Sequence, residues 1–189
     1  MRKLILASGS PRRKELLEKA GLAFEIQVSH EEEHYTKTAP CEIVMELAAL
    51  KAESIADLQT EDAVILGADT VVVSEGHILG KPSDEAEAKE MIRCLQGKTH
   101  QVMTGVCLIK ISGKDRIIRH FYESTDVHVV SMPEEEIEKY IAVGESMDAA
   151  GAYKIQGAFG RYIDRFDGDM ENIIGLPVKK VLKELEDFR

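Results

Sequence analysis

Residues 4–13 read Leu4-Ile5-Leu6-Ala7-Ser8-Gly9-Ser10-Pro11-Arg12-Arg13, an order that predicts a strand, a tight turn and the start of a helix. The apolar residues form the strand, Ser10 is placed to cap the helix, and Pro11 suits its first position. Such a turn presents free backbone N–H groups at the positive end of a helix dipole, where anions bind. The serine hydroxyls and the Arg12 and Arg13 guanidinium groups add donors suited to phosphate. An ordinary capped helix with solvated arginines explains the same residues equally well.

The rest of the chain alternates between helical and strand patterns. Helices are expected over 41–58, 84–95, 133–142 and 177–188, and strands over 24–28, 63–68, 102–111, 116–130 and 159–163. The order of strands and helices in the first half, with a long hairpin in the second, predicts one mixed α/β unit over residues 1–189.

The composition excludes several classes of function. A net charge of −10 disfavours wrapping a nucleic acid duplex, so a small anion must be held by clustered cations and a metal ion. No apolar run approaches the ~20 residues of a membrane span, and no signal-peptide core precedes the first turn. Cys41, Cys94 and Cys107 form no Cys-x-x-Cys pair, which predicts buried thiols in a reducing compartment. We therefore expect a cytoplasmic protein without nucleic acid or membrane partners.

Asp69 is expected to end the buried apolar strand 63–68, and residues 70–73 are expected to extend this strand as a second apolar run. A carboxylate there costs free energy unless it meets a cation, a metal ion or a hydrogen-bond donor, and local backbone donors are the simplest alternative. In open α/β sheets ligands bind beyond the carboxyl ends of strands, so Asp69 and Thr70 are expected to face a crevice.

Two lysines are candidates for the same crevice. Lys51 falls within the apolar stripe of the helix 41–58, between Val44 and Leu47, where an apolar residue is expected. Lys81 lies in the loop Gly80-Lys81-Pro82. Each lysine alone is explained as well by a surface side chain that keeps its charge in water. Together with Asp69 and the two arginines, they form a set suited to a metal-bound polyphosphate.

The segment His30-Glu31-Glu32-Glu33-His34 has the letters of the zinc-protease pattern H-E-x-x-H, which requires both histidines on one helix face. The segment follows an alternating strand and lacks an apolar helical stripe, so a solvated acidic loop is expected. A single carboxylate from this loop is still able to bind a metal ion.

Several short blocks occur in a fixed order along the chain: Leu6-Ala7-Ser8-Gly9-Ser10-Pro11-Arg12-Arg13, Glu33, Leu47-Ala48 with Lys51-Ala52, Gly67-Ala68-Asp69-Thr70-Val71-Val72, Gly80-Lys81-Pro82, His100-Gln101-Val102-Met103-Thr104-Gly105-Val106, and Ala150-Gly151-Ala152-Tyr153-Lys154-Ile155-Gln156-Gly157. In this order they closely resemble the Maf (septum formation inhibitor) nucleoside triphosphate pyrophosphatases, over essentially the whole chain. Glu46 departs from the resemblance, because many members of the family have an arginine there.

The resemblance implies a twisted mixed β-sheet with flanking helices and two lobes around a central cleft, similar to inosine triphosphate pyrophosphatases. It implies hydrolysis of a nucleoside triphosphate to the monophosphate and pyrophosphate with a divalent metal cation, Mg²⁺ or Mn²⁺. A homodimer is also implied.

The resemblance assigns roles to the candidate residues. Asp69, Lys51 and Lys81 are the expected catalytic residues, Asp69 and Glu33 the expected metal ligands, and Ser8 and Arg13 the expected phosphate contacts. Arg12, Thr70 and Gln156 match the subgroup that acts on dTTP and UTP. Whether Asp69 acts as a general base or only as a metal ligand stays open. Two alternatives also stay open: a house-cleaning enzyme for modified pyrimidine nucleotides, and a non-catalytic nucleotide sensor that regulates septum formation.

Overall fold

The structure is a computed structural model that describes residues 2–30, 32–186 and 188. Within these residues the sheet has seven strands in the order β2-β1-β3-β5-β6-β7, with β4 paired to β3 off this path. The strands are β1 (Lys3–Leu6), β2 (Glu25–Ile26), β3 (Ala63–Ser74), β4 (His77–Leu79), β5 (Thr99–Ser112), β6 (Asp115–Val129) and β7 (Ile163–Asp167). The helices are α1 (Pro11–Lys19), α2 (Pro40–Ala56), α3 (Glu85–Leu95), α4 (Glu134–Ala142), α5 (Met170–Ile174) and α6 (Val178–Glu186), with the 3₁₀ helices η1 (Ser146–Asp148), η2 (Ala150–Ala152) and η3 (Ala158–Tyr162).

The chain divides into two compact units. The first comprises Met1–Thr70, Thr104–Glu123 and Gly175–Arg189, and the second Val71–Met103 and Ser124–Ile174. The long strands β3, β5 and β6 each contribute residues to both units.

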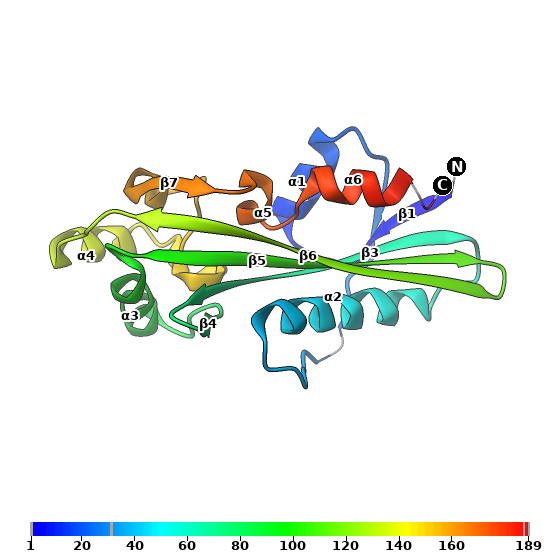
Figure 1. The fold of residues 1–189 in the computed structure, drawn as a ribbon, viewed down its shortest axis with the longest axis horizontal. Coiled ribbons are helices and arrows are strands. Elements are labelled where there is room, and N and C mark those ends of the chain that lie inside the picture. The colour runs from blue at the N-terminus through cyan, green and yellow to red at the C-terminus, as the bar shows by residue number, and fades with distance from the viewer. Residues whose placement is uncertain (1, 31, 187, 189) are drawn as a thin grey trace. The chain divides into compact units, whose positions relative to one another are not determined.

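In the first unit, β1 pairs in parallel with β2 and with β3. Helix α2 lies on one face of these strands, and α1 and α6 lie on the other (Figure 1). Helix α2 comes very close to the sheet because two strands carry glycine where it crosses. A Cβ atom on Gly67 would lie 2.3 Å from the Ala48 carbonyl oxygen, and one on Gly105 would lie 2.3 Å from the Val44 carbonyl.

The second unit has its own apolar core. Helix α3 contributes Ile92 and Leu95, and an aromatic cluster of Tyr140, Tyr153, Phe159 and Tyr162 completes it. The Tyr140 hydroxyl is satisfied by a bond to the Ala152 carbonyl at 2.9 Å. Among the helices of the described residues, none combines the length and the apolar character needed to cross a membrane.

The mixed α/β architecture predicted from the sequence is confirmed, but several expected elements are different. The strand expected over 24–28 is reduced to two paired residues, and Ile26 and Val28 are 43% and 44% exposed. The two residues pair with Ile5 and Leu6 of β1. The strand expected over 159–163 is instead the helix η3 followed by β7, because Phe159 turns into the aromatic cluster.

The prediction of buried thiols holds only for Cys107. Cys41 is half-buried and Cys94 is exposed, and all three thiols are unpaired. Burial raises the pKa of the Cys107 thiol to about 12, so it is a small apolar side chain of the core.

Candidate functional site

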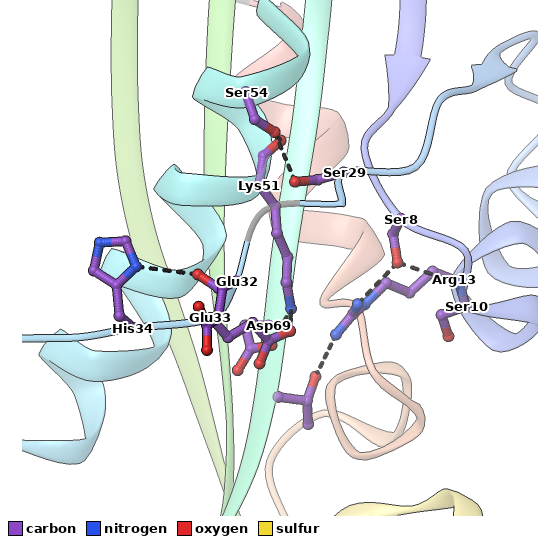
Figure 2. Close-up of polar contacts among 11 residues, drawn as sticks. Ser8, Ser10, Arg13, Ser29, Glu32, Glu33, His34, Lys51, Ser54 and Asp69 are labelled. Carbon is purple, nitrogen blue, oxygen red and sulfur yellow. Dashed lines mark hydrogen bonds and ion pairs between the residues drawn. The ribbon is translucent and has the colours of Figure 1, made fainter.

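Lys51 lies between two carboxylates in the first unit. Its Nζ is 2.6 Å from Asp69 Oδ1 and 2.8 Å from Glu33 Oε1. The Lys51 and Asp69 side chains are 17% and 13% exposed, whereas Glu33 is 57% exposed. The lysine that interrupts the apolar stripe of α2 therefore serves to neutralise a mostly buried carboxylate, and Figure 2 shows its side chain running from α2 to Asp69 beside Glu33.

The expectation that Asp69 ends its strand is wrong, because β3 continues to Ser74 through a run of valines, and the extension expected over 70–73 is confirmed. The strand that ends near Asp69 is its neighbour β1. The last paired residues are Leu6 and Leu66, and the Ala7 N–H still donates to the Leu66 carbonyl before the chain turns away at Ser8. Asp69 therefore lies just beyond the carboxyl end of β1, so the rule that ligands bind there applies through the neighbouring strand.

Arg13 joins the turn after β1 to other parts of the first unit. Its Nη1 donates to Ser8 Oγ at 3.0 Å, its Nη2 to Thr70 Oγ1 at 3.1 Å, and its Nε to the Gly175 carbonyl at 2.9 Å. Burial lowers the pKa of the Arg13 guanidinium, and the nearby Asp69 carboxylate opposes this effect. An arginine stays protonated under such conditions, so Arg13 is a buried positive charge with three defined partners.

The turn itself differs from the predicted capped helix. Ser10 occupies the N-cap position of α1, but its side chain makes no capping bond. Instead the Ser10 N–H donates to Ser8 Oγ at 3.3 Å, so Ser8 accepts from Ser10 and from Arg13 (Figure 2). The backbone of the turn is thus organised around the Ser8 hydroxyl.

Thr70 lies on the opposite face of β3 from Asp69, because successive side chains of a strand alternate. Its hydroxyl oxygen is 2.9 Å from the Thr104 hydroxyl oxygen and 3.4 Å from the Gly175 carbonyl oxygen, in addition to the contact with Arg13. Thr104 lies on β5 and is fully buried. Gly175 has φ +134°, a conformation that favours glycine.

The segment before α2 is held against that helix by side chains. Glu46 accepts the backbone N–H groups of Thr36 at 2.9 Å and Lys37 at 3.2 Å, and these bonds lower the pKa of the Glu46 carboxyl. Residues 32–38 form no helix or strand, so the predicted loop is confirmed for the described part of the H-E-x-x-H segment; residue 31 lies outside the described residues. Glu46, the departure from the family resemblance, thus fixes the loop that carries Glu33.

The remaining predicted residues belong to different units. Arg12 lies on α1, half-buried, in the first unit. Lys81 and Gln156 belong to the second unit. There Lys81 Nζ is 3.4 Å from Asp148 Oδ1, with both side chains about two-thirds exposed, and Gln156 is exposed in the turn 155–157.

The arrangement in the first unit combines groups of opposite charge over a short distance. Lys51, Arg13 and the hydroxyl of Ser8 are cationic or donor groups, and Asp69 and Glu33 are oxygen donors for a cation. Such a set can hold an anion and a metal ion together, which neither the acids nor the bases can do alone.

The sequence predicted no role in the site for Thr104, Gly175 or Glu46. Thr104 lies in the block 100–106, which gave a weak signal, because a threonine followed by glycine interrupts an apolar strand. Gly175 contributes through its backbone carbonyl, and a backbone contact cannot be predicted from the type of the residue. Glu46 is noted from the sequence as a departure from the family resemblance, but its bonds to the loop are visible only in the folded chain.

Comparisons with known proteins find similar proteins over the whole length of the chain. A family model described as "Maf-like protein" matches residues 3–188. A dTTP/UTP pyrophosphatase of Bacillus cereus is 51% identical over 189 residues, which cover 100% of this chain and 96% of that protein. A dTTP/UTP pyrophosphatase of Bacillus thuringiensis subsp. konkukian is 50% identical over 189 residues, again with coverage of 100% and 96%.

Solved structures give a more distant likeness. The Ham1 protein of Staphylococcus aureus matches with a TM-score of 0.50 and 11% sequence identity, and the match covers 100% of each chain. At this identity the likeness concerns the fold alone, and it agrees with the mixed sheet and flanking helices described above.

Proposed function

The chain belongs to the Maf-like protein family, and on this premise we propose that it hydrolyses dTTP and UTP to the nucleoside monophosphate and pyrophosphate. The proposed substrates rest on similarity over all 189 residues to relatives named dTTP/UTP pyrophosphatase. The placement of Lys51 between Asp69 and Glu33, in the same unit as the Ser8 turn, supports the chemistry.

A divalent metal ion, Mg²⁺ or Mn²⁺, is part of the proposal, with Asp69 and Glu33 as its ligands. Their fit rests on one observation: both carboxylates converge on a single cationic atom, Lys51 Nζ. Within the described residues, no group of three or more His, Cys, Asp or Glu side chains is placed to hold a metal. The fit is therefore to an ion that shares its coordination with substrate phosphates, which is usual for Mg²⁺. When bound, the ion neutralises phosphate charge and polarises the phosphorus–oxygen bonds.

The chain's own residues bind and orient the reactants. In the proposed step a water oxygen bonds to the α-phosphorus, the bond from that phosphorus to the bridging oxygen breaks, and pyrophosphate leaves. Lys51, Lys81, Arg13 and the Ser8 turn stabilise the negative charge that develops on the phosphates. Asp69 orients the attacking water or accepts its proton, and it acts alternatively as a metal ligand.

The proposal is tested by incubating the protein with dTTP or UTP and Mg²⁺ and by separating the products. We expect the monophosphate and pyrophosphate in equal amounts and no release of single phosphates. Binding of dTTP without any release of pyrophosphate would instead favour a nucleotide sensor of septum formation. Metal binding is measured independently of turnover by the electron paramagnetic resonance signal of Mn²⁺, with and without nucleotide.

Base preference is the finer part of the proposal. We assign it to Arg12, Thr70 and Gln156 by resemblance, and the exposure of Gln156 in its turn supports a contact with a ligand. A panel of ordinary and modified pyrimidine triphosphates distinguishes a dTTP and UTP enzyme from a house-cleaning enzyme. The latter gives a higher kcat/KM for a modified nucleotide than for dTTP.

Location and assembly are further parts of the proposal. Three unpaired thiols support a reducing, cytoplasmic compartment. A homodimer follows from the family resemblance alone, and sedimentation equilibrium at several protein concentrations tests it.

A further inference from the structure

The two hydroxyls assigned to the substrate, those of Ser8 and Thr70, differ in what they can still donate. An arginine donates hydrogen bonds and cannot accept them, and a backbone N–H is also only a donor. Ser8 Oγ receives one bond from Arg13 and one from the Ser10 N–H. Both of its contacts with the described residues are therefore accepted, and among these residues its own proton has no acceptor, which leaves it for an outside acceptor such as a phosphate oxygen.

Thr70 has its single proton engaged within the protein. Its oxygen accepts from Arg13 Nη2, and its two other contacts are Thr104 Oγ1 at 2.9 Å and the Gly175 carbonyl at 3.4 Å. The carbonyl can only accept. If the Thr70 proton goes to Gly175, then Thr104 donates to Thr70, and the Thr70 hydroxyl is saturated. If the proton goes to Thr104, it is equally engaged, so in both arrangements Thr70 has no proton to donate to a substrate oxygen.

Arg13 connects the two hydroxyls. The same guanidinium donates to Ser8, to Thr70 and to the Gly175 carbonyl, and it is buried with only 8% of its surface exposed. A planar guanidinium with three fixed partners has little freedom to rotate. Its orientation therefore depends on Thr70, and the orientation of Thr70 depends on the fully buried Thr104.

We propose that Thr104 is a positioning residue of this site, which acts through Thr70 and Arg13 to hold the Ser8 hydroxyl toward the substrate. Thr70 then orients Arg13 and donates no proton to the triphosphate. The inference rests on the proposed function for its catalytic readout, and it assigns to Ser8 alone the donation of a hydroxyl proton to the triphosphate.

The test uses Thr104→Val and Thr104→Ser in the full-length chain. Loss of one hydrogen bond next to a charged group predicts a decrease in kcat/KM of about tenfold for Thr104→Val. The decrease is expected to be the same for dTTP, UTP and dCTP. Thr104→Ser keeps the hydroxyl and is expected to stay within about twofold of the wild type.

Two comparisons separate positioning from a general loss of stability. Thr125 is also fully buried on a strand with a bonded hydroxyl, in the second unit, so Thr125→Val is the matched control. It is expected to lower the urea midpoint like Thr104→Val but to leave kcat/KM unchanged. In a Ser8→Ala background, Thr104→Val is expected to have no further effect on kcat/KM, because the hydroxyl that it helps to position is already gone.

Three results would overturn the inference: equal kinetics for the Thr104→Val and Thr125→Val variants, losses that multiply in the Ser8→Ala background, or a change of nucleotide preference in Thr104→Val. A wild type that releases no pyrophosphate would refute the proposed function instead. In that case the hydrogen-bonded pair is still tested by a double-mutant cycle of Thr70→Val and Thr104→Val in urea. Additive effects on the free energy of unfolding in that cycle would count against the pair.

Discussion

At Asp69, replacement of one carboxylate oxygen by an amide nitrogen removes the charge and keeps the shape of the side chain. We expect Asp69→Asn to lower kcat for dTTP by at least about 10²-fold, because both assigned roles, proton acceptor and metal ligand, need the carboxylate. The free energy of unfolding should decrease by only about 1–2 kcal/mol, because Lys51 keeps Glu33 as a partner. Pyrophosphate release and urea unfolding measure the two effects.

The matched control is Asp57→Asn, which alters an exposed ion pair with Arg116 in the same unit. It is expected to change neither kcat nor the urea midpoint appreciably. Near-normal pyrophosphate release from Asp69→Asn would contradict the assignment of this carboxylate.

His100 makes the stability of the protein sensitive to acid. It is 1% exposed, its Nε2 is 2.7 Å from the Tyr153 hydroxyl, and burial lowers its pKa to about 4, with the charge of His128 adding to this and Asp126 opposing it. The unfolded state takes up a proton near pH 6.5, before the folded state does, so stability is lost as the pH falls. We expect this group to account for about 2 kcal/mol of the loss between about pH 7 and pH 5.

The measurement is urea unfolding of the wild type and of His100→Asn at both pH values. We expect the variant to be less stable than the wild type at neutral pH. Its free energy of unfolding should decrease between pH 7 and pH 5 by about 2 kcal/mol less than that of the wild type. His77→Asn alters an exposed histidine of the second unit and should keep the wild-type pH dependence. If the His100→Asn and wild-type curves ran parallel, the buried neutral histidine would not be the cause.

Residues of the site were predictable where a side chain violates the pattern of its element. Lys51 interrupts an apolar stripe and Asp69 interrupts an apolar strand, and the two prove to be partners. The positions of Ser8 and Arg13 were predictable from the strand–turn–helix order. The contribution of Gly175 was not, because a backbone carbonyl belongs to every residue and only the folded chain decides which carbonyl meets Arg13.

At the scale of elements, the approach of α2 to the sheet depends on glycine. A Cβ atom at position 67 would lie 2.3 Å from the Ala48 carbonyl oxygen and 2.9 Å from Ala52 Cβ, both on the helix. We expect Gly67→Ala to lower the free energy of unfolding by about 2–4 kcal/mol, because helix and strand must separate. Urea unfolding measures the loss, and a decrease of activity should accompany it because Lys51 lies on the displaced helix.

Gly80→Ala provides the control for this substitution. A Cβ atom there meets no other atom within 4 Å, so the change in stability should stay within about 0.5 kcal/mol. Equal stability of the Gly67→Ala and Gly80→Ala variants would show that α2 can move away from the sheet at little cost.

Most long elements were predictable because their periodicity is strong. The helix expected over 84–95 is observed as α3 from Glu85 to Leu95, and the long hairpin is observed as β5 and β6. The short elements failed for physical reasons. Strand β2 is an edge strand whose apolar residue, Ile26, is exposed, and the segment 158–162 is shaped by its aromatic packing and not by local preference.

At the scale of the whole molecule, a net charge of −10 opposes binding of other polyanions. A nucleic acid duplex at about 0.15 M salt should neither shift the mobility of the protein nor inhibit pyrophosphate release from dTTP, because no broad positive field is available to replace its counterions. Fluorescence anisotropy of a labelled duplex measures binding. In the inhibition assay, free pyrophosphate added as a competitor of dTTP is the positive control. Saturable duplex binding with a strong salt dependence would contradict the expectation.

The alternating side-chain directions of β3 limit how this chain can change in evolution. Gly67 and Asp69 face α2, and Thr70 faces Arg13, because neighbouring positions of the strand point to opposite sides. The number of residues between these positions is therefore constrained as well as the residue types. Insertion or deletion of one residue between Leu66 and Asp69 would exchange the two faces and bring the carboxylate to Arg13 and the threonine to Lys51. In homologous strands that keep this chemistry, the residue types should vary here, but an insertion or deletion should not have an odd number of residues.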